Sequence, residues 1–239
     1  MSKTNKKPIH ILIYGNAGVG KSILASTFPK CLYLDFDNGT NHYENHFKEN
    51  KYLRGENLIT YLQKAIQQIE KGTFEYETIV IDSLTNLENT AISQFKKLDI
   101  NNWSQNLYQS NQKKLQYEDW GNVSGSTISL LSYMRTLPIN IVIITQIDKA
   151  RVDGTLKNFP MLVGKGQLES LHFADIVGYM YSTNPSKPQR YLAISSTEED
   201  NYYAKIRNLS SSKDPIKNPN FEKISKLLSD ESISLDFED

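Results

Sequence analysis

Apolar residues occur in short blocks that are separated by polar turns along most of the chain. The first block, Ile9–Tyr14, is rich in isoleucine and ends at a glycine, which is the pattern of a buried strand. Similar blocks predict further strands over 32–36, 78–82 and 139–145. Three later segments are also predicted to be strands: 175–182, 190–196 and 202–207.

Helical patterns fill the intervals between these strands. Leu58, Leu62, Ala65, Ile66 and Ile69 repeat at helical spacing, which predicts an amphipathic helix over 57–71. Four more helices are predicted over 21–27, 84–98, 121–137 and 219–229. The alternation of strands and helices predicts an α/β fold, in which a mostly parallel sheet has helices on both faces and an antiparallel C-terminal extension.

Three polar segments show no clear periodicity, namely 38–56, 99–119 and 147–167. The last two are long enough to be functional loops. We expect a polar lead over 1–8, a single domain over 9–229 and an acidic tail over 230–239. The segment 210–219 is predicted to be a linker.

The composition excludes several classes of protein. The 239 residues include 27 basic and 27 acidic ones, so the net charge is zero and any nucleic-acid binding must come from local basic groups. The single cysteine excludes an intrachain disulfide framework and a cysteine-based zinc cluster. No apolar run is long enough to span a membrane, and we expect a cytoplasmic protein.

A phosphate-binding loop is the most specific motif. It follows the first strand, precedes a helix and matches GxxxxGK[ST] through Gly15, Asn16, Ala17, Gly18, Val19, Gly20, Lys21 and Ser22. Its glycines let successive backbone N–H groups face one anion. Lys21 is predicted to reach the β- and γ-phosphates of ATP, and the Ser22 hydroxyl to bind Mg²⁺.

Polar residues at the ends of other strands are candidates for the rest of this site. Asp82 is placed to complete the Mg²⁺ site, although an aspartate there is also a common helix cap. Asp35 and Asp37 alternate after the second strand, so one of them is a candidate general base, and a solvated turn is the alternative. Gln146 follows the fourth strand, where it is either a γ-phosphate sensor or an ordinary strand-end amide.

These motifs and their order resemble the RecA-like P-loop ATPases. More narrowly, the chain resembles the phage AAA/RecA-core nucleotide-binding proteins that act in single-strand annealing or recombination. The resemblance covers about 9–228 and includes GNAGVGKS, LYLDFDNGT, TIVIDSLTNL, YEDWG, IVIITQIDK and YYAKIRN.

The resemblance implies roles for particular residues. Asp37 falls where such proteins place a catalytic glutamate, so the shorter side chain is a departure from their pattern. Asp82 falls on the Walker B position and Gln146 on the sensor position, whose strand lies beside the P-loop strand. Lys205 and Arg207 resemble a pair of cations that acts on the nucleotide of a neighbouring subunit, and a solvated edge strand is the alternative.

The resemblance also implies partners: single-stranded DNA, further copies of the chain in a ring or filament, and a single-strand-binding protein in a bacterial host. DNA would contact the two long polar loops, whose cations and aromatic side chain suit phosphates and bases. The candidates are Trp103, Lys113, Lys114, Lys149, Arg151, Lys157 and Lys165. The alternative is that these lysines are solvated and that Trp103 is a core anchor. Trp120 is expected to pack in the core.

Two other functions remain open from the sequence. The first is an ATP-dependent switch whose loops bind a protein and no nucleic acid. The second is a small-molecule kinase, which the scarcity of arginine and the lack of an arginine-rich lid make a weaker hypothesis.

Overall fold

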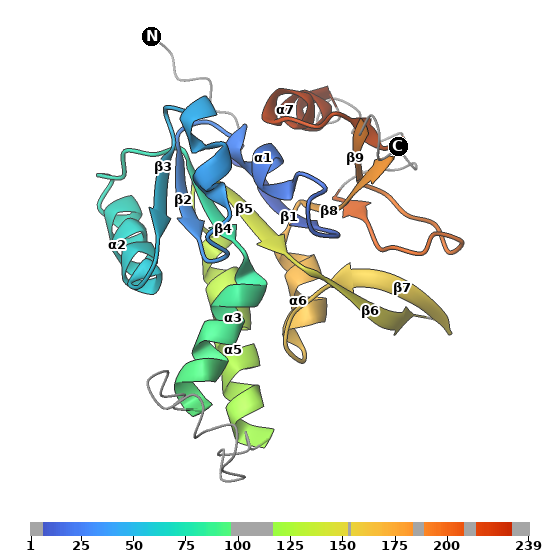
Figure 1. Cartoon of the computed structure of the whole chain (residues 1–239), viewed down its shortest axis with the longest axis horizontal. Helices are drawn as coiled ribbons and strands as arrows, with labels where there is room; N and C mark the ends of the chain where they lie inside the picture. The colour runs from blue at the N-terminus through green and yellow to red at the C-terminus, as the bar shows by residue number, and fades with distance from the viewer. Residues whose placement is uncertain (1–6, 97–116, 153, 184–188, 208–213, 231–239) are drawn as a thin grey trace, which may run out of the picture.

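In the computed structural model, the structure describes residues 7–96, 117–152, 154–183, 189–207 and 214–230 (Figure 1). A single large sheet forms the centre, with the strand order β11-β9-β8-β1-β5-β4-β2-β3, and β10 pairs with β8. Its strands are β1 (His10–Tyr14), β2 (Cys31–Asp35), β3 (Lys51–Arg54), β4 (Thr78–Asp82), β5 (Asn140–Thr145), β8 (Ile176–Thr183), β9 (Gln189–Ala193), β10 (Lys205–Ile206) and β11 (Ile216–Lys217).

The strands from β8 to β3 in this order are parallel, whereas β9, β10 and β11 pair antiparallel with their neighbours. This confirms the predicted α/β architecture with an antiparallel C-terminal extension. The helices are α1 (Lys21–Ser26), α2 (Leu58–Glu70), α3 (Leu84–Lys96), α5 (Tyr117–Met134), α6 (Gly166–Phe173) and α7 (Phe221–Asp230).

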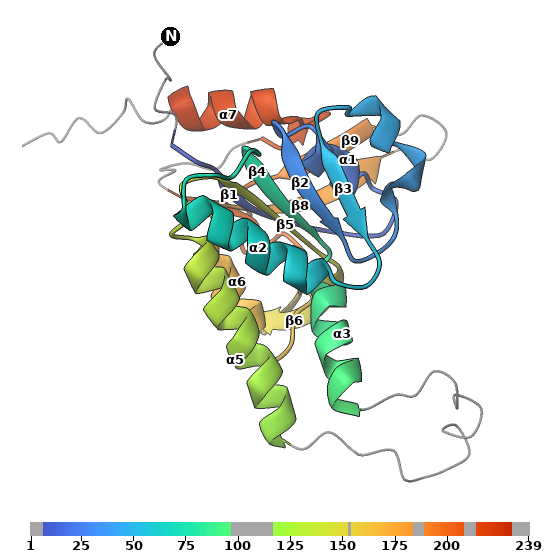
Figure 2. The same ribbon diagram turned by 90° about the vertical axis from the view of Figure 1, so that its left-hand side faces the viewer.

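Each face of the sheet carries its own hydrophobic core, because side chains alternate along every strand. Leu12, Ile81 and Ile143 point to the face that α2, α5 and α6 cover. Ile13 and Val80 point to the other face, where α1 and α7 pack (Figure 2). The carboxyl ends of β1, β2, β4 and β5, which are the buried strands of the sheet, therefore meet at one of its edges.

Two predictions about loops are wrong. The segment 38–56 holds two short 3₁₀ turns, Thr40–His42 and Glu44–His46, and then the edge strand β3. The segment 147–167 is largely a two-stranded hairpin of β6 (Ile147–Val152) and β7 (Thr155–Pro160). The predicted linker over 210–219 also includes β11, which pairs with β9.

Candidate nucleotide-binding site

The phosphate-binding loop leaves β1 at the carboxyl edge of the sheet. Gly15 lies against β8, and a Cβ atom at this position would be 2.2 Å from the Met180 carbonyl oxygen. Gly18 and Gly20 have φ values of +77° and +100°, which L side chains rarely adopt. Only glycine therefore fits these positions, and the curled backbone turns its N–H groups toward a common centre, which suits an anion.

Lys21 lies over this loop. Its Nζ atom donates hydrogen bonds of 2.8 Å to the carbonyl oxygens of Gly15 and Asn16. Burial lowers the pKa of Lys21, while the nearby carboxylates of Asp82 and Asp37 raise it. An ammonium group is thus held where the loop can bring it against a bound phosphate.

Asp82 ends β4 and is buried beside two hydroxyl groups. Its Oδ2 atom accepts a 2.5 Å hydrogen bond from the Tyr33 hydroxyl. Burial raises the pKa of Asp82 to about 6, while hydrogen bonds from Ser22 and Tyr33 lower it. Asp82 and Ser22 offer the oxygen ligands that Mg²⁺ prefers, and a buried carboxylate gains from an adjacent cation, so these two residues fit the predicted metal.

Asp37 is exposed at the same edge of the sheet, and its position is fixed. Its Oδ1 atom accepts hydrogen bonds from the Ser83 N–H at 3.1 Å, the Ser83 hydroxyl at 2.8 Å and the Asn86 amide at 2.7 Å. Its backbone N–H donates to the Asp82 carbonyl oxygen at 3.2 Å. These donors orient one carboxylate oxygen and leave the other without a hydrogen bond to the described residues.

Asp35 has a different environment, although it alternates with Asp37 in the sequence. It is fully buried and accepts hydrogen bonds from Gly39 and Thr40. It also forms an ion pair with Arg54 of β3 at 3.3 Å. Asp35 therefore anchors the turn after β2, and Asp37 is the carboxylate that the site presents.

Gln146 follows β5, which lies between β1 and β4. Its backbone N–H donates to the Thr85 hydroxyl at 3.0 Å, and its carbonyl oxygen accepts from Met161 at 2.9 Å. The side chain is exposed. The backbone is thus fixed and the amide is free to contact a ligand at this edge.

A family model described as an AAA domain matches residues 7–208. The chain belongs to this AAA domain family. The sheet order and the motifs give the AAA domain a RecA-like α/β fold. No curated protein matches the sequence.

Two solved structures are similar to this AAA domain. A KaiC-like protein from Pyrococcus horikoshii has 12% identity and a TM-score of 0.47, with 81% of each chain covered. The flagellar accessory protein FlaH from Methanocaldococcus jannaschii has 12% identity and a TM-score of 0.45, with 89% of this chain and 85% of that chain covered. No described helix of the AAA domain is long and apolar enough to cross a membrane.

Sequence reasoning missed two tyrosines of the AAA domain that lie beside Asp82. Tyr33 alternates with Asp35 on β2, so strand periodicity was the signal that could have placed it on the face of the site. Tyr43 follows the first 3₁₀ turn, and its buried hydroxyl lies beside Tyr33 and Ser22. Burial raises the pKa of Tyr43 to about 12, so its hydroxyl stays protonated.

The predicted trans-acting pair of the AAA domain lies away from its own phosphate-binding loop. Lys205 pairs with Val177, near the start of β8. The parallel strands begin at this edge of the sheet, which is opposite to the edge that carries the phosphate-binding loop. Arg207 forms an ion pair with Asp175 at 3.7 Å and donates to the His172 carbonyl oxygen at 2.9 Å. Any contact of this pair with a nucleotide would therefore involve another copy of the chain.

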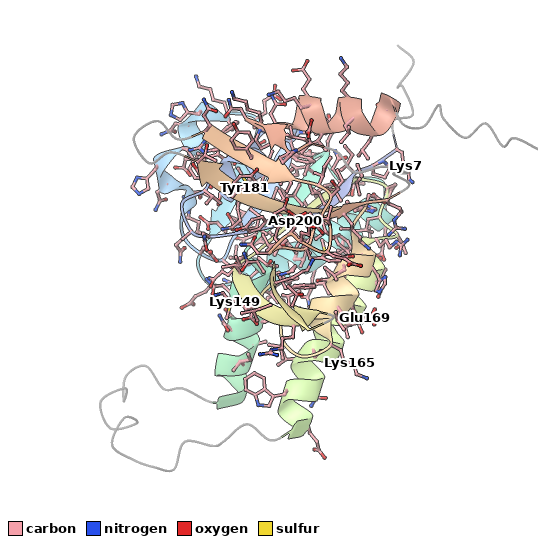
Figure 3. The ribbon with its side chains drawn as sticks, turned by 90° about the vertical axis from the view of Figure 1, so that its right-hand side faces the viewer. Lys7, Lys149, Lys165, Glu169, Tyr181 and Asp200 are labelled. Atoms are coloured by element: carbon pink, nitrogen blue, oxygen red, sulfur yellow. The ribbon has the colours of Figure 1, made fainter. Side chains whose placement is uncertain are left out.

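The predicted DNA contacts fall into three groups. Lys149 and Arg151 on β6 and Lys165 before α6 are exposed, and Lys149 and Lys165 lie on one side of the molecule (Figure 3). Lys157 does not match the expectation of a surface cation, because it is 7% exposed and donates to the Thr197 carbonyl oxygen at 2.7 Å. Trp103, Lys113 and Lys114 lie outside the described residues.

Trp120 differs from its predicted place in the core. It lies in the first turns of α5 and is 42% exposed. An aromatic side chain is thus available next to the segment where the sequence predicts the first DNA-contacting loop.

Proposed function

We propose that this protein binds ATP with Mg²⁺ and hydrolyses it. The observation that carries the proposal is the convergence of the curled loop over 15–22, the ammonium group of Lys21 and the buried carboxylate of Asp82. The loop and Lys21 bind the phosphates, and Ser22 with Asp82 holds the metal. Mg²⁺ supplies charge neutralisation on the β- and γ-phosphates.

Asp37 is the group that activates water in this proposal. Its free oxygen accepts a proton as the water oxygen bonds to the γ-phosphorus, and the bond from that phosphorus to the bridging oxygen of ADP breaks. Gln146 orients the γ-phosphate through its exposed amide. Lys205 and Arg207 stabilise the transferring phosphoryl group from a neighbouring copy in a ring or filament.

Two substitutions test the assignment of roles. Lys21→Ala is expected to abolish ATP turnover, because it removes the ammonium group from the phosphates. Asp37→Asn is expected to reduce turnover by about 100-fold or more while leaving ATP affinity nearly unchanged. Calorimetry measures the affinity, and phosphate release measures the turnover. Equal turnover by the wild type and Asp37→Asn would remove Asp37 as the base.

We further propose that the protein binds single-stranded DNA and promotes annealing or recombination. Support comes from exposed cations and an aromatic side chain beside the segments that flank β5: Lys149, Arg151, Lys165 and Trp120. Because the net charge of the whole chain is zero, the affinity must depend on these local groups.

The DNA proposal predicts a salt-dependent affinity for an oligonucleotide in the presence of an ATP analogue. The double variant Lys149→Glu and Arg151→Glu is expected to lower this affinity and the slope of log K against log salt. Lys217→Glu is the matched control, since Lys217 is an exposed cation on β11. An oligonucleotide that does not bind the wild type with the ATP analogue present would overturn this part of the proposal.

A protein-binding switch is the second candidate function. Three large apolar side chains are exposed on or next to β7 and α6, namely Leu156 at 52%, Met161 at 40% and Leu168 at 59%. Exposed apolar groups of this size favour a protein surface as the partner. This candidate predicts that serine substitutions at these three positions leave oligonucleotide binding unchanged, and a loss of oligonucleotide binding would contradict it.

A further inference from the structure

Arg190 on β9 packs against the phosphate-binding loop. A Cβ atom at Gly20 would be 2.7 Å from the Arg190 Nε atom, 2.8 Å from its Cδ atom and 3.0 Å from its Cζ atom. The guanidinium group therefore lies directly on the residue that precedes Lys21. Nothing in the linear sequence connects these positions, which are brought together by the antiparallel end of the sheet (Figure 1).

The Arg190 side chain has no acidic partner among the described residues. The ion pairs of arginine in the described part of the chain involve Arg54 and Arg207. Arg190 is half-buried, so its charge is partly removed from water at Gly20, while the Lys21 ammonium group lies at Gly15 and Asn16 of the same loop. Two cations close to one loop repel each other, and an anion bound at that loop would remove the repulsion.

The backbone around Arg190 is fixed in this position. Its carbonyl oxygen accepts a 2.7 Å hydrogen bond from the Asn218 N–H, next to β11. The neighbouring strand β8 contacts the other end of the loop through Met180 and Gly15. Strands β8 and β9 thus hold both ends of the phosphate-binding loop, and β9 adds a positive charge to it.

We propose that the guanidinium group of Arg190 binds a phosphate of the nucleotide held by residues 15–22, in the same chain. This inference rests on the proposed nucleotide binding and adds to it a residue that no motif contains. Arginine suits the role because its planar group offers several N–H donors to phosphate oxygens. The contact makes the antiparallel end of the sheet part of the nucleotide site.

The alternative is that Arg190 only covers Gly20 with its aliphatic stem. Arg190→Met separates the two, because it keeps an unbranched stem of similar length and removes the charge. Arg190→Lys keeps a charge and serves as the conservative variant. Lys217→Met is the matched control, since this residue pairs with Tyr191, the neighbour of Arg190, and its side chain is exposed.

The experiment measures the dissociation constants of Mg–ADP and Mg–ATP by calorimetry for the wild type and the three variants, at two salt concentrations. Arg190→Met is expected to weaken binding about tenfold or more and to reduce its salt dependence, with an unchanged melting temperature of the nucleotide-free protein. Arg190→Lys is expected to recover most of the affinity, and Lys217→Met to match the wild type.

Binding by Arg190→Met within about threefold of the wild type would overturn the inference while leaving nucleotide binding intact. If Arg190→Met does not fold, Arg190→Gln decides, because it also removes the charge. The proposed phosphate contact predicts a smaller salt dependence of nucleotide binding for Arg190→Gln, and a pure packing role predicts an unchanged one, which would overturn the inference. A wild type that binds neither nucleotide would overturn the proposed function itself, which is a distinguishable outcome.

Discussion

A carboxylate that is buried as deeply as Asp82 is poorly stabilised in its ionised form. Burial disfavours the charge, and the hydroxyl groups of Tyr33 and Ser22 compensate only in part, so the pKa of Asp82 lies at about 6. Metal binding requires the ionised carboxylate, so a proton and Mg²⁺ compete for this side chain. The proposed function therefore predicts that the affinity of the site for Mg–nucleotide depends on pH.

The competition between a proton and Mg²⁺ for Asp82 predicts how nucleotide affinity changes with pH. Because the pKa of Asp82 is raised to about 6, Mg–ADP affinity is expected to be nearly constant above pH 7 and to fall as the pH drops below about 6. Well below this pKa, the Mg–ADP affinity is expected to fall about tenfold for each pH unit. Titrations from pH 5 to 8 measure it, and Asp82→Asn is expected to remove the dependence. A flat profile for the wild type would contradict the raised pKa.

Single residues of the site were predictable only where a local pattern marks them. The glycine spacing of 15–22 defines the loop, and Asp82 and Gln146 each follow an apolar strand. Tyr33 is marked only by its alternation with Asp35, which does not reveal its contact with Asp82, and Arg190 has no local mark. Their roles depend on contacts between positions far apart in the chain, such as Arg190 with Gly20, and these contacts exist only after the sheet has formed.

At the scale of elements, one buried side chain connects the helices below the site. Glu88 of α3 accepts a 2.7 Å hydrogen bond from the Thr127 hydroxyl of α5 and a 2.8 Å hydrogen bond from the Val163 N–H. It is 2% exposed, and burial raises its pKa. Glu88 thus ties α3 to α5 and to the segment that carries Lys165.

Replacing Glu88 is expected to destabilise the protein. Glu88→Gln places an amide where two donors need acceptors, and the unsatisfied group should lower the free energy of unfolding by about 1–3 kcal/mol. Urea denaturation measures this change. Glu169→Gln, at an exposed position of α6, is the control, with an expected change in the free energy of unfolding within about 0.5 kcal/mol. Equal losses for the two variants would mean that the Glu88 hydrogen bonds do not stabilise the fold.

The sequence predicted the buried strands and the amphipathic helix α2 because their periodicity is strong. It failed for β3, whose four residues, Lys51–Arg54, are polar at both ends and lie at the edge of the sheet. It also failed for the β6–β7 hairpin, although the dipeptide at 153–154 is a common two-residue turn. The polar composition of β6 and β7 concealed the alternation of side chains that marks a strand. The turn dipeptide between them was the signal that could have identified the hairpin.

For the molecule as a whole, the folded unit extends beyond the segment that matches the AAA domain. The match ends at residue 208, whereas β11 and α7 follow it. The ring of Phe221 packs against Phe28 with centroids 5.0 Å apart, and Ile224 is fully buried in the core beside α1. The helix α7 therefore completes the core beside α1, the helix that follows the phosphate-binding loop.

Removing the main contact of α7 is expected to weaken the whole domain. Ile224→Ala leaves a cavity and should lower the free energy of unfolding by about 2–5 kcal/mol. Thermal and urea unfolding measure the effect. Lys226→Ala, at an exposed position of the same helix, should change stability by less than about 0.5 kcal/mol. If both variants matched the wild type, α7 would contribute little to the core.

The central place of β1 also affects how the protein is made. Among the strands of this sheet β1 is synthesised first, yet it lies between β5 and β8, which begin at Asn140 and Ile176. One of its hydrogen-bonding edges therefore stays open until β5 has been synthesised, and the other until β8 has been synthesised. During that interval the nascent chain presents an apolar strand with an unpaired edge, and the phosphate-binding loop lacks its contact with Met180 of β8.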